Sequence, residues 1–448
     1  MGIVIKMPDE VIYLLNKLEA SGFEAYIVGG CVRDSIMGAT PHDWDICTSA
    51  NPYEIQNVFK DEKIILTGVQ HGTITVVVNG GNFEITTFRI DGNYIDYRFP
   101  SGVNFTKNLI EDLQRRDFTI NAMAYNEKAG LIDLFSGYDD LQNKIIKCVG
   151  NPDNRFTEDA LRILRAWRFS CQLEGFSIDI DTLISAKKNI ILLEHISAER
   201  IQSEFMKAFS NTKNFVRNIF VDDYFLRYIL PEWKLMDLNQ HNPHHVYSVD
   251  IHSLIALQYV QDSKDTILKL ATFLHDIGKP SAYIETDKIG HFVGHNKIGM
   301  EIVDKFMIRL RFDNATREAV IKLVLYHDTD LWPSGKSIKR WLNKIGEKQL
   351  RRLIELKRAD AFAQSKSTSE AKLNNLVLVE QKLDEIIQEN ACFSIKDLNI
   401  NGNDLIKIVG FKQGKRLGEV LSTLLQKVID EELENDKLVL LNAAKEML

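Results

Sequence analysis

Two aspartates one residue apart, Asp43 and Asp45, follow a short glycine-containing segment near the start of the chain. Side chains alternate along a strand with a period of two, so a strand here would present both carboxylates on one face. Neighbouring carboxylates repel each other and need cations, and Mg²⁺ prefers oxygen ligands and bridges phosphates. The preceding Gly29 and Gly30 let backbone amides approach phosphates closely. The spacing therefore predicts a nucleotidyl-transfer site that uses Mg²⁺.

Six segments resemble, in order, the motifs of the polymerase-beta-type nucleotidyltransferases, and within them the bacterial tRNA CCA-adding enzymes and poly(A) polymerases. These segments are Gly29-Gly30-x-x-Arg33-Asp34, Asp43-x-Asp45, His71-Gly72-Thr73, Glu84-Ile85-Thr86-Thr87-Phe88-Arg89, Arg115-Arg116-Asp117-Phe118-Thr119-Ile120-Asn121-Ala122 and Arg155-Phe156-Thr157-Glu158-Asp159-Ala160-Leu161-Arg162. The resemblance implies a template-independent enzyme that adds CCA to the 3′ end of tRNA from CTP and ATP. A poly(A) polymerase, or an enzyme that adds only CC or only A, is the alternative.

The resemblance also implies roles for single residues in this head region. Asp43, Asp45 and Glu84 are the expected catalytic carboxylates. The expected nucleotide-binding residues are Gly29, Gly30, Arg33, Arg115, Arg116, Asp117, Asn121, Asp159, Arg162 and Arg165. Guanidinium groups match the geometry of phosphate oxygens, and a carboxylate such as Asp117 accepts a hydrogen bond from a ribose 2′-hydroxyl. The segment 91–102 resembles the mobile loop with which the family switches between nucleotides.

Asp159 and Arg162 lie three residues apart on a predicted helix and would share a face. A carboxylate accepts a hydrogen bond from an exocyclic amino group and an arginine donates to a ring nitrogen or carbonyl, so the pair can read the Watson–Crick edge of C or A. Taken alone, this spacing is more often an ordinary helix salt bridge. In the family it replaces a template base. Glu199, Arg200 and Glu204 resemble a later motif that braces this helix.

A second group of potential metal ligands lies in the middle of the chain: His252, His275, Asp276, His295, His327 and Asp360. The adjacent His275-Asp276 pair resembles the HD-type metal phosphohydrolases. Imidazoles and carboxylates suit divalent transition metals such as Ni²⁺ or Mn²⁺, and a two-metal centre would activate water against a phosphate ester. We expect release of phosphate from 2′,3′-cyclic nucleotides or 2′-phosphates. Two alternatives belong to other functional classes of protein. One is a regulatory HD phosphohydrolase whose head is a relic, and the other is a non-catalytic RNA-binding protein.

The elements that would position these residues form an α+β fold: a small α/β head followed by a long helical body. Only the head is expected to contain strands. In the head, 73–79 and 82–89 are predicted as strands joined by a hairpin turn at Gly80-Gly81, and 11–20 as an amphipathic helix. The predicted parts are a nucleotidyltransferase head (1–150), a helical neck with the base-reading helix (151–235), an HD metal-binding domain (236–366) and a helical tRNA-binding tail (367–448). In the tail, Lys407, Lys412, Lys415 and Arg416 are the expected RNA-binding residues.

Composition sets wider bounds on this 448-residue chain. A net charge of −7 means that a protein binding RNA must concentrate its Lys and Arg locally. Five scattered cysteines indicate free thiols in a reducing compartment. There is no apolar run long enough for a membrane span and no signal-like N-terminus, so we expect a cytoplasmic protein. The oligomeric state does not follow from the sequence.

Overall fold

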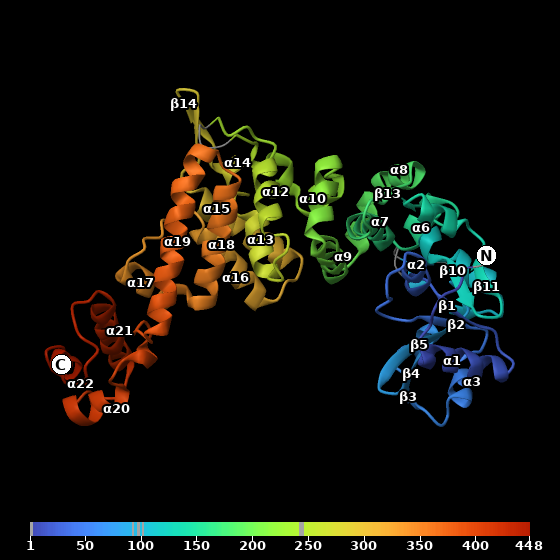
Figure 1. The fold of residues 1–448 in the computed structure, drawn as a ribbon, viewed down its shortest axis with the longest axis horizontal. Coiled ribbons are helices and arrows are strands. Elements are labelled where there is room, and N and C mark those ends of the chain that lie inside the picture. Colours follow the sequence, from blue (N-terminus) through green and yellow to red (C-terminus); the bar gives the residue numbers. More distant parts are fainter. Residues whose placement is uncertain (1–2, 92–93, 96–98, 101–102, 242–245) are drawn as a thin grey trace. The chain divides into compact units, whose positions relative to one another are not determined.

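The computed structural model describes residues 3–91, 94–95, 99–100, 103–241 and 246–448. The chain divides into two compact units, Met1–Ile229 and Leu230–Leu448, which are described separately (Figure 1). Among the described residues, none of the helices has the length and the apolar content that a membrane crossing requires.

The head is built on a seven-stranded sheet with the order β11-β10-β1-β2-β5-β4-β3. Its strands are β1 (Ala25–Val28), β2 (Ile46–Thr48), β3 (Lys63–Ile65), β4 (Thr73–Val78), β5 (Gly81–Thr87), β10 (Met123–Asn126) and β11 (Gly130–Asp133). The β2–β5 pair is parallel and the other neighbours are antiparallel. The strongest strand signal is β4, where β-branched residues alternate between buried and half-buried positions. The predicted hairpin at Gly80-Gly81 is confirmed, with Val78 opposite Gly81.

Short helices pack around this sheet: α1 (Asp9–Ala20), α2 (Gly30–Ile36), α3 (Pro52–Val58), α4 (Leu109–Gln114) and α5 (Gly137–Gln142). The predicted amphipathic helix is α1, which buries its Val and Leu side chains. Beyond β5, β6 (Arg89–Asp91) pairs with β9 (Val103–Phe105), and β7 (Tyr94–Ile95) pairs with β8 (Phe99–Pro100). The expected nucleotide-switching loop at 91–102 lies largely outside the described residues.

The rest of the first unit is almost wholly helical, as predicted. It contains α6 (Pro152–Glu158), α7 (Leu161–Gln172), α8 (Ile180–Lys188), α9 (Ala198–Ser210), α10 (Thr212–Val221) and α11 (Tyr224–Ile229), with one two-residue strand pair, β12 (Ile145–Ile146) with β13 (Ser177–Ile178). The core of this bundle is aromatic: Trp167 of α7 packs against Phe215 and Phe225 with tilted rings, whose centres lie 5.9 and 6.3 Å from its own.

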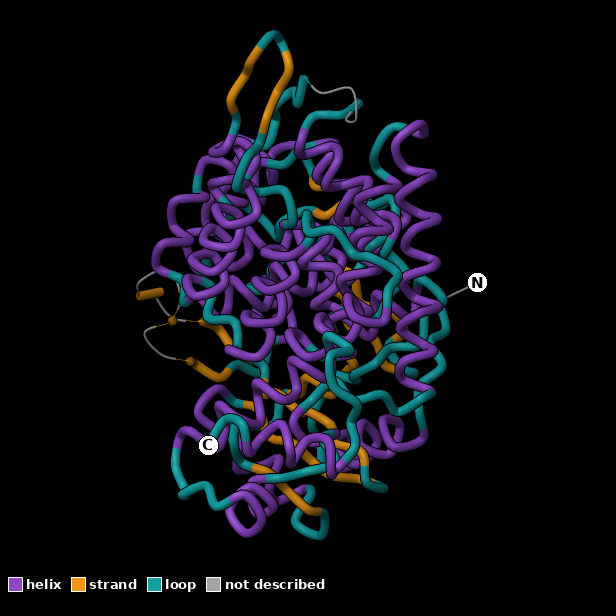
Figure 2. The backbone as a smooth tube through the Cα atoms, turned by 90° about the vertical axis from the view of Figure 1, so that its left-hand side faces the viewer, coloured by secondary structure: helices purple, strands orange, loops and turns teal. Residues whose placement is uncertain are grey.

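The second unit is a helical body whose helices are α12 (Val249–Tyr259), α13 (Thr266–Leu274), α14 (Lys279–Ala282), α15 (His295–Arg309), α16 (Asn314–Tyr326), α17 (Gly335–Ile345), α18 (Glu347–Phe362) and α19 (Lys366–Gln388). A small hairpin, β14 (Ile284–Thr286) with β15 (Ile289–His291), projects from this body (Figure 2). The expectation that strands occur only in the head is therefore wrong in this detail. The hairpin forms because two short isoleucine-containing segments flank a turn at Asp287-Lys288, where both residues have positive φ.

The chain ends in a small helical tail with its own apolar core, formed by residues between Cys392 and Ala444. Its elements are α20 (Gly402–Asp404), the π-helix Leu405–Val409, α21 (Lys415–Ile429) and α22 (Lys437–Lys445). The long helix α19, with which the predicted tail begins, packs against α18 and α17 of the helical body. The division of the chain into four functional parts stays a prediction.

Candidate active site in the head and a second metal centre

Asp43 lies in a bend and Asp45 in the segment that leads into β2, so neither is on the strand itself, which begins at Ile46. The carbonyl of Asp45 accepts a hydrogen bond from the amide of Val28 at 3.0 Å, which fixes Asp45 beside the end of β1. Because Ile46 pairs with Ile85 in the parallel β2–β5 ladder, Glu84 occupies the equivalent position on the next strand. The sheet therefore places Asp45 and Glu84 side by side.

The charges around Asp45 reflect this placement. The pKa of Asp45 is raised, chiefly because surrounding protein atoms exclude solvent from its carboxylate. The guanidinium of Arg116 opposes this effect, whereas the negative charges of Glu84 and Asp43 add to it. Asp43 itself extends into solvent: its side chain is 88% exposed, with Oδ1 3.4 Å from Nδ1 of His42. A negatively charged neighbourhood of this kind favours a bound cation.

The three head carboxylates do not converge into one closed ligand cluster in these side-chain conformations. In the described part of the chain, every group of three or more potential ligand atoms within 4.8 Å of one another lies in the helical body. Asp43, which extends into solvent, lies apart from the other two. The site in the head is thus an open edge of the sheet, where the charges of Glu84 and Asp43 act on Asp45.

The glycine turn beside these carboxylates is tightly packed. Gly29 has φ of +80°, and a Cβ at this position would lie 3.2 Å from Nη1 of Arg116. The Gly29 amide donates to the carbonyl of Met123 at 3.2 Å, so this turn is fastened to β10. Gly30 then begins α2, whose first amides follow directly on the turn.

The predicted arginine pair is held by a residue that the sequence analysis missed. Asp112 is fully buried and accepts hydrogen bonds from Nε and Nη2 of Arg115 at 3.0 and 2.7 Å and from Nη2 of Arg116 at 3.1 Å. Although burial opposes it, the two guanidinium groups lower the pKa of Asp112. The signal was present, because Asp112 precedes the two arginines by three and four residues, the spacing of helical neighbours.

Asp117 and Asn121, which the sequence assigned to nucleotide binding, belong to a buried polar network. Oδ2 of Asp117 accepts from Nε of Arg165 at 2.7 Å, and Oδ1 accepts from the amide nitrogen of Asn121 at 3.2 Å. The amide oxygen of Asn121 in turn accepts from Nη1 of Arg33 at 2.7 Å. Burial alone would raise the pKa of Asp117, but the positive charges of Arg165 and Arg162 outweigh this effect and lower the pKa strongly. Four of the predicted nucleotide-binding residues are therefore joined in one network.

The predicted base-reading helix is interrupted. Helix α6 ends at Glu158, Asp159 is extended (φ −137°, ψ 103°), and α7 begins at Leu161. Asp159 and Arg162 therefore do not share one continuous helix face. Instead, Oδ1 of Asp159 accepts from the amide of Leu161 at 3.1 Å, at the start of α7. A polar residue that satisfies a free helix amide in this way breaks the helical run without any proline or glycine.

Asp159 and Arg162 are each held by another charged residue. Oδ2 of Asp159 accepts from Nη2 of Arg200 at 3.0 Å. Nη1 of Arg162 donates to Glu158 at 2.8 Å, and Nη2 donates to the carbonyl of Arg115 at 2.9 Å. The last contact connects the start of α7 to the arginine motif of the head. Arg200 thus contacts Asp159 directly, consistent with the expected bracing role.

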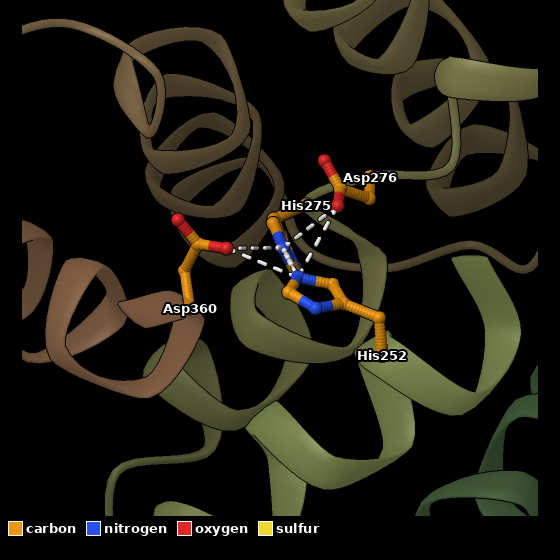
Figure 3. A group of neighbouring side chains, drawn as sticks. All are labelled: His252, His275, Asp276 and Asp360. Atoms are coloured by element: carbon orange, nitrogen blue, oxygen red, sulfur yellow. Dashed lines mark hydrogen bonds and ion pairs between the residues drawn. The ribbon is translucent and has the colours of Figure 1, made fainter. Parts of the chain in front are cut away.

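The helical body brings all six predicted metal ligands together. His252, His275, Asp276 and Asp360 form one group, shown in Figure 3, and Asp276, His295 and His327 form a second. The two groups share Asp276: Oδ2 lies 3.4 and 3.2 Å from Nε2 of His252 and His275, whereas Oδ1 lies 3.5 and 3.4 Å from Nε2 of His295 and His327. A shared carboxylate between two ligand groups is the arrangement of a two-ion site.

The protonation of the four imidazoles fits metal ions. In each ring, Nδ1 lies 2.7–3.2 Å from a backbone carbonyl and must donate its proton there. The Nε2 atoms then carry lone pairs, yet they face each other at 3.3 Å in the His252–His275 pair and 3.1 Å in the His295–His327 pair. In neutral rings, Nε2 atoms placed this close together are suited to binding cations between them. The carboxylates of Asp276 and Asp360 outweigh the opposing effect of burial and raise the pKa of His275 to about 10, so this position favours positive charge.

In the tail, all four expected RNA-binding residues, Lys407, Lys412, Lys415 and Arg416, are exposed. Arg416 also has a contact within the fold, because its Nη2 donates to the carbonyls of Met447 and Leu448 at 2.9 Å. It therefore stabilises the C-terminal end of the fold. The five cysteines are all buried and unpaired, as expected for free thiols.

Three family models match the chain. The poly(A) polymerase head domain matches residues 25–147, the probable RNA- and SrmB-binding site of polymerase A matches residues 175–236, and a putative second domain of tRNA nucleotidyltransferases matches residues 285–444.

Full-length relatives point in the same direction. The chain is 34% identical to a CCA-adding enzyme of Ligilactobacillus salivarius, over 100% of this chain and 99% of the relative, and 35% identical to that of Staphylococcus haemolyticus, over 97% and 96%. Its structure is similar to that of the Bacillus stearothermophilus CCA-adding enzyme in complex with CTP, with 26% identity and a TM-score of 0.70 over 99% of this chain and 98% of that one. By its motifs, its fold and its similarity to these relatives along the whole chain, this protein belongs to the family of CCA-adding enzymes.

Proposed function

We propose that this protein adds C, C and A to the 3′ end of tRNA from CTP and ATP, and that the transfer takes place at the sheet edge of the head. The observation that carries this proposal is the placement of Asp45 beside Glu84 by the parallel β2–β5 pairing, next to the glycine turn. The whole-length similarity to CCA-adding enzymes supports it.

The residues of the head fit the needs of Mg²⁺-dependent in-line transfer. Asp43, Asp45 and Glu84 offer the hard oxygen ligands that Mg²⁺ prefers. When bound, such ions lower the pKa of the attacking RNA 3′-hydroxyl and neutralise charge on the triphosphate. Gly29, Gly30 and the adjacent start of α2 let the backbone approach phosphate oxygens, and Arg116 adds positive charge beneath this turn. Positioning of this kind supplies most of the catalysis in phosphoryl-type transfers.

We assign the choice of nucleotide to the start of α7 and its neighbours. Arg162 and Asp159 supply one donor group and one acceptor group, which together suit the Watson–Crick edge of C or A. For Asp117, which Arg165 and Asn121 hold, we propose the role of accepting a hydrogen bond from a ribose 2′-hydroxyl. In the tail, Lys407, Lys412 and Lys415 are the proposed contacts to the outer part of tRNA.

The buried free thiols suit the reducing conditions of the cytoplasm, the compartment that we propose for this protein.

One incubation separates the possible transferases. A tRNA lacking its last three nucleotides is given to the protein with Mg²⁺ and CTP, ATP or both, and the products are sequenced. We expect CC with CTP alone and CCA with both nucleotides. With both nucleotides present, long A tracts would instead identify a poly(A) polymerase, and a product that stops at CC or gains only A would identify a partial enzyme. No incorporation under any of these conditions would overturn the assignment.

The helical body supports a second activity, metal-dependent hydrolysis of phosphate esters. Its two ligand groups share Asp276, and their Nε2 atoms are arranged to accept metal ions. Ni²⁺ or Mn²⁺ suits this mixture of nitrogen and oxygen ligands, and when bound would supply an activated water. Lys279, with Nζ 2.7 Å from Oδ2 of Asp276, holds the shared carboxylate in place.

The test of this second activity is phosphate release from 2′,3′-cyclic nucleotides and 2′-phosphates in the presence of a panel of divalent metals. We expect release with Ni²⁺ or Mn²⁺, and its loss in His275→Ala. The Asp45→Asn protein serves as the control, because it leaves this centre intact. Absence of release with every metal would overturn the hydrolase assignment.

A further inference from the structure

A cavity of about 310 Å³ adjoins the metal ligands of the helical body. Its walls include ligands from both groups, residues Gly290–Val293 at the C-terminal end of the β14–β15 hairpin, and two lysines, Lys279 and Lys372. A pocket of this size beside a cluster of metal ligands is suited to a small phosphate-bearing group. The two lysines differ in the protein contacts that their ammonium groups already make.

Lys279 is committed to the protein. Its Nζ lies 2.7 Å from Oδ2 of Asp276 and 2.8 Å from Oε1 of Gln240, and 5.3 Å from the ring centre of Phe292. The residue is 5% exposed. Its contacts stabilise Asp276 and leave little freedom to follow a substrate.

Lys372 is placed differently, on the exposed surface of α19. Its Nζ donates to Oε1 of Gln364 at 2.9 Å, and Nε2 of Gln364 donates to both carboxylate oxygens of the metal ligand Asp360 at 3.0 Å. The amide of Gln364 therefore separates the ammonium group from the carboxylate. An ammonium group carries three donors, and this contact uses one of them.

We propose that Lys372 binds the phosphate group of the substrate at this metal centre, and that Gln364 is the positioning residue that orients both Lys372 and Asp360. The proposal rests on the second activity assigned above. A cation that is held by a neutral amide keeps its full charge for an incoming anion, whereas a direct ion pair with Asp360 would neutralise it. Gln364 also fixes the carboxylate from outside the ligand set, as second-layer hydrogen bonds do in metal sites.

Binding of inorganic phosphate to the Mn²⁺-loaded full-length protein, measured by isothermal titration calorimetry, tests this role without requiring turnover. We expect Lys372→Ala to weaken phosphate binding about tenfold, as for loss of one charge-assisted hydrogen bond, and Lys372→Arg to restore most of it. The control is Lys382→Ala, because Lys382 lies on the same helix but pairs with Glu385 at 2.8 Å and does not line the cavity. Wild-type affinity in Lys372→Ala, or no phosphate binding by the wild-type protein, would overturn the proposal.

Kinetics give an independent readout. For phosphate release, Lys372→Ala should raise KM by a similar factor with a smaller change in kcat, whereas Gln364→Ala should also weaken Mn²⁺ binding about tenfold or more. Unchanged Mn²⁺ affinity in Gln364→Ala would contradict its positioning role. If the wild-type protein binds Mn²⁺ and phosphate but releases no phosphate from any ester, the hydrolase assignment fails while the binding role of Lys372 stands.

Discussion

At the level of single residues, the head shows how charged groups are held before any substrate arrives. Asp112 engages both Arg115 and Arg116, and Asp117 engages Arg165 and, through Asn121, Arg33. Residue types and motif order identified most of this set. Asp112 was not predicted, because a carboxylate close to two arginines in sequence usually lies on the surface. Only its complete burial shows that it holds the two arginines.

Arg162 should determine base choice. In Arg162→Ala, we expect discrimination between correct and incorrect nucleotides to fall about 10- to 100-fold, the range associated with loss of a good bidentate base contact. Single-turnover incorporation of each of the four nucleotides measures this. The control is Arg217→Ala, an exposed arginine on α10. Unchanged fidelity with intact transfer would show that α7 does not read the base.

The ionisation of Asp45 should determine how far the pH can fall before nucleotide transfer is lost. Its pKa is raised, and only its charged form binds a cation, so protons compete with Mg²⁺ as the pH falls through this raised pKa. As the pH is lowered, the Mg²⁺ concentration needed for half-maximal transfer should therefore begin to rise at a higher pH than it would for an aspartate with an ordinary pKa. Single-turnover rates at several Mg²⁺ concentrations, with circular dichroism recorded at each pH, test this. A Mg²⁺ requirement that stays constant down to the usual aspartate range would contradict it.

At the level of elements, the sequence predicted the existence of helices and strands better than their ends. The β4–β5 hairpin was recognised because alternating β-branched residues and a Gly-Gly turn give one consistent signal. The break at Asp159 was not, since the run from Pro152 to Gln172 contains no internal glycine or proline. At the break, Asp159 accepts from the amide of Leu161 and from Arg200, which lies 41 residues further along the chain, and neither contact can be read from local sequence.

The packing of α9 against α7 includes a buried ion pair that should matter for stability. Nε of Arg168 lies 2.9 Å from Glu204, and the side chains are 10% and 4% exposed. Glu204→Gln leaves the arginine charge without a buried partner, so we expect a loss of about 3 kcal/mol in the free energy of unfolding of the first unit. Chemical denaturation followed by circular dichroism measures it.

The matched control is the exposed pair of Glu174 and Lys213, whose side chains are 75% and 71% exposed. Glu174→Gln should change stability by less than about 0.5 kcal/mol. Similar effects of the two substitutions would contradict a special role for the buried pair.

At the level of the whole molecule, the two proposed centres are built from different compact units. The carboxylates of the head belong to the unit that ends at Ile229, and the histidine centre belongs to the unit that begins at Leu230. The six ligands of the second centre were identified from their residue types and from the resemblance of the adjacent His275-Asp276 pair to the HD-type phosphohydrolases. The hairpin and cavity beside them were not, because residues distant in sequence form the cavity wall.

This separation predicts independent activities. Asp45→Asn should abolish nucleotide addition and retain phosphate release, whereas His275→Ala should do the reverse, each retained rate lying within about twofold of the wild type because each substitution is far in sequence from the other site and belongs to another unit. Assays of both activities on the same preparations measure this. Loss of both activities in either folded variant would show that the two centres are coupled.

The central claim, that the carboxylates beside the glycine turn carry out nucleotidyl transfer, is tested most directly by one comparison. A tRNA ending in CC is incubated with Mg²⁺ and ATP under single-turnover conditions, with wild-type protein, Asp45→Asn and the exposed-site control Asp61→Asn. We predict addition of a single A by the wild type and the control, and a rate at least about 1,000-fold lower in Asp45→Asn with an unchanged circular dichroism spectrum. Transfer by Asp45→Asn at the wild-type rate would contradict the account.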